Sequence, residues 1–310
     1  MYNFRTDLAD ERREIYKKAN KMENEIPGID TEYDERENMK ITRVKIKEIE
    51  GAKALGKPIG TYITIDIKNL HLAQNEEIDK AANCVCDELK KIYSNYVSDI
   101  DDILVVGLGN MHVTPDALGP KVINSIDVTR HLLKYVPEVL EPNTRPVSAI
   151  SPGVLGTTGM ETQEILKGIV DNIHPKLIIA IDSLASTSIE RISNTLQIAD
   201  TGVSPGAGVG NKRKELSKDT LGVPVIVIGV PTVVDAATLT AEGLDILIEK
   251  LQNDAKSNDY LNNLKNEDKY DIIKDALIPK DYNLIVTPKE IDELIQNMSD
   301  VIARGINLSF

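Results

Sequence analysis

The 310 residues are enough for one large α/β domain or two smaller ones. A net charge of −13, from 36 Lys and Arg against 49 Asp and Glu, gives an acidic surface that repels phosphate backbones, which argues against direct nucleic-acid binding. No apolar run approaches membrane-spanning length, and the start of the chain has no apolar segment typical of a signal peptide. We therefore expect a soluble protein without a membrane or nucleic-acid partner.

The N-terminal third of the chain is expected to be less regular than the rest. Residues 1–38 are polar, charge-rich and weakly periodic, so we predict a peripheral N-terminal arm. Residues 42–49 and 61–67 alternate between apolar and polar side chains, which predicts an antiparallel ribbon over 42–67. A helix is predicted over 76–96.

The two cysteines, Cys84 and Cys86, both fall in the pattern of that helix. Residues two apart on a helix do not face each other, so these two are poor disulfide partners. Two thiols alone do not complete a zinc site. Free thiols favour a reducing, cytoplasmic compartment.

From Ile103 onward, strand patterns alternate with helix patterns, which indicates an α/β fold with a mostly parallel central sheet and helices on both faces. The expected strands are 103–107, 147–150, 177–181, 194–199, 223–229 and 282–286, and the expected helices are 117–133, 161–173, 235–251 and 288–303. We expect 103–251 to form the core. Residues 252–271, rich in Asn, Asp and Lys, are predicted to be a mobile surface segment.

Two aspartates stand where predicted core strands end. Asp116 lies in the turn after strand 103–107, and Asp182 closes the strand that begins at Leu177. Chemistry in an open parallel sheet sits outside the carboxyl ends of the strands, where two carboxyls can converge on one water. Either residue taken singly also fits the common role of a helix N-cap or turn aspartate.

Other motifs are incomplete. Gly107-Leu108-Gly109 resembles the opening of a dinucleotide fingerprint, but His112 occupies the place of the third glycine. The loop 206–214 is glycine-rich with a basic end, but it lacks the Gly-Lys-Ser/Thr ending of a phosphate-binding loop. Ser151 has no Gly-x-Ser-x-Gly elbow, and the histidines show no paired metal spacing. Carboxylates are therefore the strongest chemistry that this sequence offers.

Several blocks, in one order, resemble the germination (spore) protease family. They are Leu104–Asn110, Val113–Pro120, Arg145–Ile150, Pro152–Val154, Ile179–Ala185, Gly208–Glu215 and Gly229–Ala236. The similarity runs from Arg5 to Glu290, so it covers nearly the whole chain. The two catalytic aspartates proposed for that family fall on Asp116 and Asp182, the pair that the strand ends also single out.

The resemblance implies an endopeptidase that starts the degradation of small acid-soluble spore proteins during germination, in the spore core and without a cofactor. It also implies a homotetramer, made as a zymogen that removes its own N-terminal segment. Family cleavage sites place an acidic residue before the cut, then a hydrophobic residue and Ala. Arg5–Ala9 has this form, with the cut between Asp7 and Leu8. Residues 1–7 would then be a propeptide, and 8–310 a single protease domain.

Further residues are expected to assist the two aspartates. Backbone N–H groups near Gly109 and Asn110, or in the loop that contains Gly153, are candidates for stabilising an oxyanion. Lys212 and Arg213 could bind the acidic residue that precedes the cut, although the same loop also fits a solvated surface role.

Two alternatives stay open. The segment from Gly107 to Gly119 is also similar, more distantly, to hydrogenase maturation peptidases, whose equivalent acid is a metal ligand. A metal-dependent peptidase would use Asp116 and Asp182 with His112 or Asp235 as ligands. A non-catalytic α/β module that binds a small molecule or nucleotide is the third hypothesis.

Overall fold

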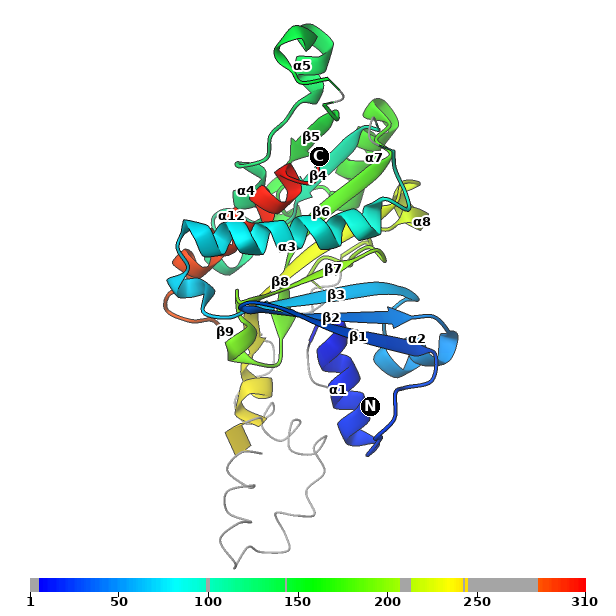
Figure 1. Cartoon of the computed structure of the whole chain (residues 1–310), viewed down its shortest axis with the longest axis vertical. Coiled ribbons are helices and arrows are strands. Elements are labelled where there is room, and N and C mark those ends of the chain that lie inside the picture. Colours follow the sequence, from blue (N-terminus) through cyan, green and yellow to red (C-terminus); the bar gives the residue numbers. More distant parts are fainter. Residues whose placement is uncertain (1–5, 99–100, 143, 207–212, 242, 245–283) are drawn as a thin grey trace, which may run out of the picture.

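The computed structural model describes residues 6–98, 101–142, 144–206, 213–241, 243–244 and 284–310. Within these ranges the strands form one twisted sheet in the order β1-β2-β3-β7-β8-β6-β4-β5, and β9 pairs with β8 (Figure 1). The strands are β1 (Ile29–Arg36), β2 (Met39–Ile46), β3 (Gly60–Ile67), β4 (Ile103–Gly107), β5 (Val147–Ile150), β6 (Leu177–Ser186), β7 (Thr195–Ala199), β8 (Val225–Asp235) and β9 (Ile285–Val286).

The helices that accompany the sheet vary widely in length. The α-helices are α1 (Ala9–Ala19), α2 (Ile49–Leu55), α3 (Asn75–Tyr93), α4 (Leu118–Ile123), α5 (Arg130–Tyr135), α6 (Leu155–Thr158), α7 (Thr162–Ile173), α8 (Lys218–Leu221) and α12 (Ile291–Asn307). Short 3-10 helices are η1 (Leu70–Leu72), η2 (Thr114–Asp116), η3 (Pro137–Val139) and η4 (Ile189–Arg191).

The parallel half of the sheet has helices on both faces, as the sequence predicts. Strands β8, β6, β4 and β5 run parallel. Successive side chains of a strand point to opposite faces. Ile103 and Val105 therefore pack in the core that contains α3 and α12, whereas Leu104 and Val106 pack in the core that contains α7. In Figure 1, α3 and α12 cross one face of this half.

The antiparallel ribbon is larger than expected and is not separate. Residues 29–36, predicted to belong to a peripheral arm, form β1 and pair with β2. Strand β2 pairs with β3, and β3 pairs with β7, so the ribbon continues into the central sheet. The antiparallel pairing also includes β7 with β8. The sheet is thus divided into an antiparallel half and a parallel half that meet at β8.

The prediction of a peripheral arm over residues 1–38 is wrong for the part that the structure describes, which begins at Thr6. Leu8 and Ala9 are fully buried, and α1 begins at Ala9. Ala9 packs with apolar side chains of β2, β3 and α2. The charged composition misleads because Ala9, Ile26 and Ile29 pack in the core of the ribbon, while the buried charges of Asp10 and Arg13 form ion pairs with Arg191 and Glu25.

Three core elements differ from the predicted bounds. The helix expected over 117–133 is two helices, because Asp127 N–H donates to Asn307 Oδ1 and Thr129 N–H donates to Val147 O instead of continuing the helix. Two strands extend beyond their predicted ends: β8 continues to Asp235 instead of ending at Gly229, and β6 continues to Ser186 instead of ending at Ile181. Asp182 therefore lies inside a strand. The neighbouring strand β4 ends at Gly107, which pairs with Ile181 of β6. Asp182 is therefore the first residue of β6 beyond the end of β4.

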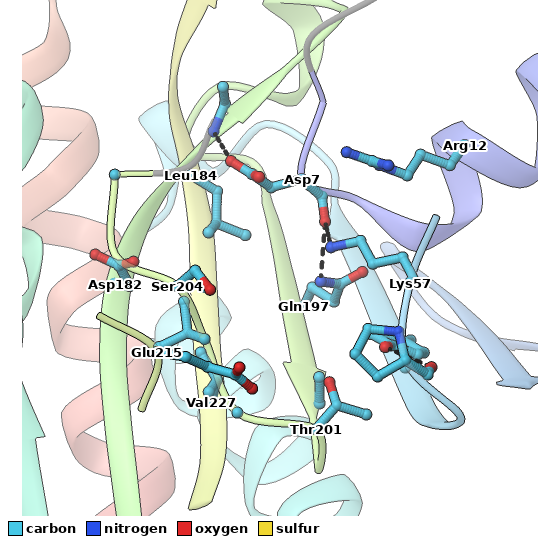
Figure 2. A pocket seen from close by; sticks show the side chains of 18 of the residues that line it. Asp7, Arg12, Lys57, Asp182, Leu184, Gln197, Thr201, Ser204, Glu215 and Val227 are labelled. Carbon is cyan, nitrogen blue, oxygen red and sulfur yellow. Dashed lines mark hydrogen bonds between the residues drawn. The ribbon is translucent and has the colours of Figure 1, made fainter. Parts of the chain in front are cut away.

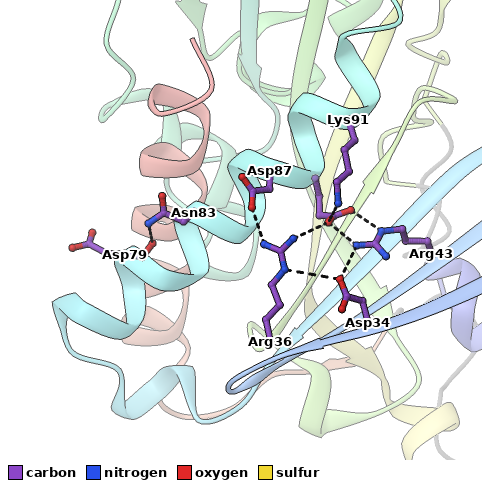
Figure 3. Close-up of polar contacts among 8 residues, drawn as sticks. Asp34, Arg36, Arg43, Asp79, Asn83, Asp87 and Lys91 are labelled. Atoms are coloured by element: carbon purple, nitrogen blue, oxygen red, sulfur yellow. Dashed lines mark hydrogen bonds and ion pairs between the residues drawn. The ribbon is translucent and has the colours of Figure 1, made fainter.

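An ionic cluster ties the ribbon to α3 (Figure 3). The fully buried carboxylate of Glu88 accepts two hydrogen bonds from Arg43 of β2, at 2.8 and 2.7 Å, and one from Lys91 at 2.7 Å. Burial acts to raise the pKa of Glu88, but the hydrogen bonds from Arg43 and Lys91 hold it below its usual value. Arg36 reaches the exposed Asp87 on the same helix.

Some predictions fall wholly or partly outside the described residues. The surface segment 252–271 lies wholly outside them, and most of the helix 235–251 and the start of the strand 282–286 lie outside them as well.

Both cysteines, Cys84 and Cys86, are free and buried on α3. Within the described ranges, no helix is long and apolar enough to cross a membrane.

Candidate active site

Asp116 is held by a tight turn that follows β4. Gly109 has φ +112°, and a Cβ there would collide with the main-chain oxygen of Asp116. Asn110 N–H donates to that oxygen at 2.9 Å, and Asp116 N–H donates to Val113 O at 2.8 Å. Only glycine allows this approach. The turn places η2, which ends at Asp116, against β6 and β8.

Asp182 lies in a row of residues that crosses three strands. It pairs with Gly229 of β8, and Gly229 pairs with Gln197 of β7. Registered neighbours project to the same face of a sheet, and adjacent strands lie about 4.8 Å apart. Gln197 and Asp182 therefore share the face opposite α3 and α12, about two strand spacings apart, across a glycine without a side chain.

Asp116 and Asp182 line one cavity of about 400 Å³. Burial raises the pKa of Asp116 to about 6, although the Asn110 N–H acts in the opposite direction. Burial raises the pKa of Asp182 well above its usual value, and the charges of Asp116 and then Asp7 add to this effect. The charge of Asp116 thus bears on the titration of Asp182, because a nearby negative charge disfavours ionisation of a second carboxyl.

A second cavity, of about 280 Å³, lies on the other side of Asp182. Asp182, Ser183, Leu184 and Gly206 line both cavities. The wall of the second one includes Asp7, from the N-terminal segment, together with Lys57 and Gln197 (Figure 2). Asp7 of the chain's own N-terminal segment therefore lies near Asp182.

The segment Thr6–Ala9 is bound along its whole length. Asp7 N–H donates to Ala185 O at 2.9 Å, and Asp7 Oδ2 accepts from Ala185 N–H at 3.0 Å. Ala9 N–H donates to Gln197 Oε1 at 2.8 Å. Leu8 is fully buried, so the apolar side chain after Asp7 is enclosed by protein.

The carbonyl oxygen of Asp7 accepts from two side chains of the antiparallel half, both drawn in Figure 2. Lys57 Nζ donates at 2.6 Å and Gln197 Nε2 at 3.4 Å. Burial lowers the pKa of Lys57 to about 8, while Asp7 acts to raise it and Arg12 to lower it. Lys57 follows Gly56, whose left-handed backbone ends α2, and its N–H donates to Ala52 O at 3.2 Å.

Sequence reasoning missed Lys57 and Gln197. Gln197 carried a signal: it is a polar residue between Leu196 and Ile198 in an apolar strand, and only 5% of it is exposed. Lys57, in a Gly-Lys-Pro turn, looked like an ordinary surface residue.

The other predicted site residues are placed as follows. Gly109, Asn110, Gly153 and Arg213 line the cavity that contains Asp116, and Lys212 lies outside the described residues. Since Asn110 N–H is engaged by Asp116, its role towards an oxyanion stays a prediction. The Asp7 carboxylate contacts Ala185 of β6.

The metal alternative lacks a complete ligand set in the described ranges. No group of three or more His, Cys, Asp or Glu side chains there could hold a metal ion. His112 is exposed. Asp235 Oδ1 accepts from the N–H of Thr238 at 3.0 Å and from its hydroxyl at 3.2 Å, which is the N-cap role.

Comparison with known proteins decides the family. The germination protease family matches residues 6–263 and 259–310 of this chain. The chain belongs to the germination protease family. It is 49% identical to a germination protease of Caldanaerobacter subterraneus subsp. tengcongensis, over 98% of this chain and 93% of that one. Germination proteases of Clostridium perfringens (strain ATCC 13124) and Bacillus mycoides are 47% and 40% identical, over 100% and 99% of this chain and 95% and 93% of theirs.

Membership of the germination protease family makes this chain an endopeptidase. Among solved structures, a [NiFe] hydrogenase maturation protease, HycI from Thermococcus kodakarensis KOD1, matches at 18% identity with a TM-score of 0.27. That match covers 47% of this chain and 80% of the other. At this TM-score the likeness has no bearing on mechanism.

Proposed function

We propose that this germination protease starts the breakdown of small acid-soluble spore proteins, cutting after an acidic residue and before a hydrophobic residue followed by Ala. The observation that carries the proposal is the bound segment Asp7-Leu8-Ala9, which has this form: Asp7 lines a cavity that Asp182 also lines, and Leu8 and Ala9 are fully buried. Buried Leu8 and Ala9 support a site that selects an apolar side chain and then a small one.

The same segment supports self-processing. The chain would cut between Asp7 and Leu8, releasing residues 1–7 as a propeptide. Until that cut is made, the segment fills the place that a substrate needs. A zymogen of this kind therefore requires no separate inhibitor.

The chemistry we propose is activation of one water by the two aspartates. Asp116, with its pKa raised to about 6, is mostly ionised at neutral pH and acts as the base that deprotonates water. Asp182, whose pKa burial raises well above its usual value, holds a proton and gives it to the leaving nitrogen. One carboxyl thus acts as the base and the other as the acid.

The deciding experiment is incubation of the full chain with a peptide that carries one acidic–hydrophobic–Ala site. Mass analysis should find a single cut after the acidic residue, and loss of Met1–Asp7 from the protein itself. A matched peptide with Asn or Gln in place of the acidic residue should stay intact. Equal cleavage of both peptides would contradict the proposed specificity.

We also propose that no metal is required. Stoichiometric metal in purified protein, with cleavage lost to a chelator and restored by that metal, would favour the metal-dependent alternative.

We further propose a homotetramer located in the spore core. Light scattering of the purified chain tests the tetrameric state, and fractionation of spores tests the location.

A further inference from the structure

The peptide bond between Asp7 and Leu8 has its carbonyl group held by two side chains. Its carbonyl oxygen accepts hydrogen bonds from Lys57 Nζ at 2.6 Å and from Gln197 Nε2 at 3.4 Å. These are the only two side chains drawn with dashed lines to that oxygen in Figure 2, and Asp182 lies across Leu184 from them. Neither donor belongs to the loops in which the sequence predicted an oxyanion site.

We propose that Lys57 and Gln197 form the oxyanion site of this protease and are catalytic residues. This inference rests on the proposed cut between Asp7 and Leu8. In this arrangement the N-terminal segment is bound as a substrate, with the carbonyl to be attacked already held by a cation and an amide.

The burial of both donors fits this role. Gln197 is 5% exposed, and Lys57 lies in a cavity wall with its ammonium 5.7 Å from the centre of the Tyr62 ring. A charge-assisted hydrogen bond in a site sheltered from water is worth more than one in solvent. Asp7 and Arg12 are the charged groups that bear on Lys57.

Gln197 has a second contact that fixes the direction of the peptide. Its Oε1 accepts from Ala9 N–H at 2.8 Å, two residues after the carbonyl that its Nε2 contacts. One amide side chain therefore spans the bond to be cut and sets its register against β7. Any bound substrate would use the same pair of groups, one carbonyl and one N–H, without regard to sequence.

The proposed reaction balances in two steps. Water attacks the Asp7 carbonyl carbon and gives its proton to the ionised aspartate, while the carbonyl π electrons move to the oxygen and form the oxyanion. That oxyanion is held by Lys57 and Gln197. The carbonyl then re-forms, the bond from carbon to the Leu8 nitrogen breaks, and that nitrogen takes the proton of the other aspartate. The products are a new α-carboxyl group on Asp7, which then loses its proton to solvent, and the Leu8 amine. The two aspartates have exchanged protonation states, and proton transfer with solvent restores them.

The test compares self-cleavage rates of full-length variants, measured by mass, with kcat and KM for the acidic–hydrophobic–Ala peptide. Gln197→Glu keeps the acceptor for Ala9 N–H and removes the donor to the carbonyl. Lys57→Met removes the cation. We expect each to lower both the self-cleavage rate and kcat about a hundredfold, with KM changed less than about threefold. Lys57→Arg should recover part of the rate.

Lys53→Met is the matched control, because Lys53 is an exposed lysine of α2, four residues before Lys57. It should cleave at the wild-type rate. Gln197→Glu is nearly isosteric, so it keeps the test valid even if Lys57→Met fails to fold. Wild-type rates in both Gln197→Glu and Lys57→Met, with Asp182→Asn inactive, would overturn the oxyanion assignment alone. A wild-type chain that cuts neither itself nor the peptide would overturn the proposed function.

Discussion

The two halves of the sheet contribute different things to the site. The parallel half supplies Asp116 and Asp182, at the point where β4 ends and β6 continues. The antiparallel half supplies Lys57 and Gln197, which hold the N-terminal peptide. Parallel strands end together and expose polar turns there, which suits a reacting pair of carboxyls. An antiparallel ribbon with α1 and α2 beneath it suits the binding of an extended peptide.

Two parts of the proposed reaction therefore come from separate parts of the chain: the parallel half supplies the groups that move protons, and the antiparallel half supplies the groups that hold the carbonyl to be attacked. The row formed by Gln197, Gly229 and Asp182 joins them across β8. Replacing either aspartate should stop the reaction and leave the protein folded. Replacing Lys57 or Gln197 should slow the same reaction, whereas changes in the ion pairs of β1–β3 should affect the stability of the ribbon.

The largest expected effect is on the reaction. Asp182→Asn or Asp116→Asn should lower the cleavage rate about a thousandfold, since each removes a group that moves a proton. Circular dichroism and a thermal melt should show a folded protein, because Asn fills the same space. Normal self-cleavage in either variant, read as loss of Met1–Asp7 by mass, would remove that residue from the mechanism.

The next largest effect is on the stability of the ribbon formed by β1–β3, compared with that of the parallel half. Glu88→Ala should destabilise the protein by about 3 kcal/mol, because Arg43 loses its buried partner. Hydrogen exchange should rise most in β1–β3 and little in β4 and β6. Asp87→Ala is the control: the neighbouring carboxylate is 53% exposed and should matter by less than about 0.5 kcal/mol. Uniform exchange over both halves would show that the ribbon has no separate stability.

A smaller effect tests the turn that holds Asp116. Gly109→Ala should cost about 2 kcal/mol in urea unfolding, because the residue has φ +112° and its Cβ would meet Asp116. Gly168→Ala, in α7 with open space around it, should instead stabilise by about 0.5–1 kcal/mol. If Gly109→Ala melted like the wild type, the turn would not constrain Asp116 as described.

The last effect, which is small within any one pH unit, is on the pH dependence of stability. The pKa of Asp182 is raised in the folded protein from an ordinary value of 3.8, so the folded state holds more protons above pH 3.8 and stability falls as pH rises. The free energy of unfolding of Asp182→Asn, measured in urea relative to the wild type, should increase from pH 4 to 7 by at most about 1.4 kcal/mol per pH unit. For Asp116→Asn the growth should end near pH 6. A constant difference would mean that Asp182 titrates normally.

Much of the parallel half could be predicted from the sequence. Its strands are short apolar runs between turn signals, and burial on both faces leaves little choice for such runs. Asp116 and Asp182 were singled out by the same reasoning, because carboxyls that follow two parallel strands meet at one edge of the sheet. The split of the predicted helix 117–133 was not predictable, because its cause is a hydrogen bond to Asn307 from the far end of the chain.

By itself, the sequence determined the fold class and the family, and it singled out two aspartates that line one cavity, because periodicity, motif blocks and strand-end residues are local properties of the chain. Only the tertiary structure decided that the charged N-terminus is buried and that Lys57 and Gln197 meet at the Asp7 carbonyl. Those contacts join residues 50 and 190 positions apart. Such pairings depend on strand order and register across the whole sheet, which no local pattern encodes.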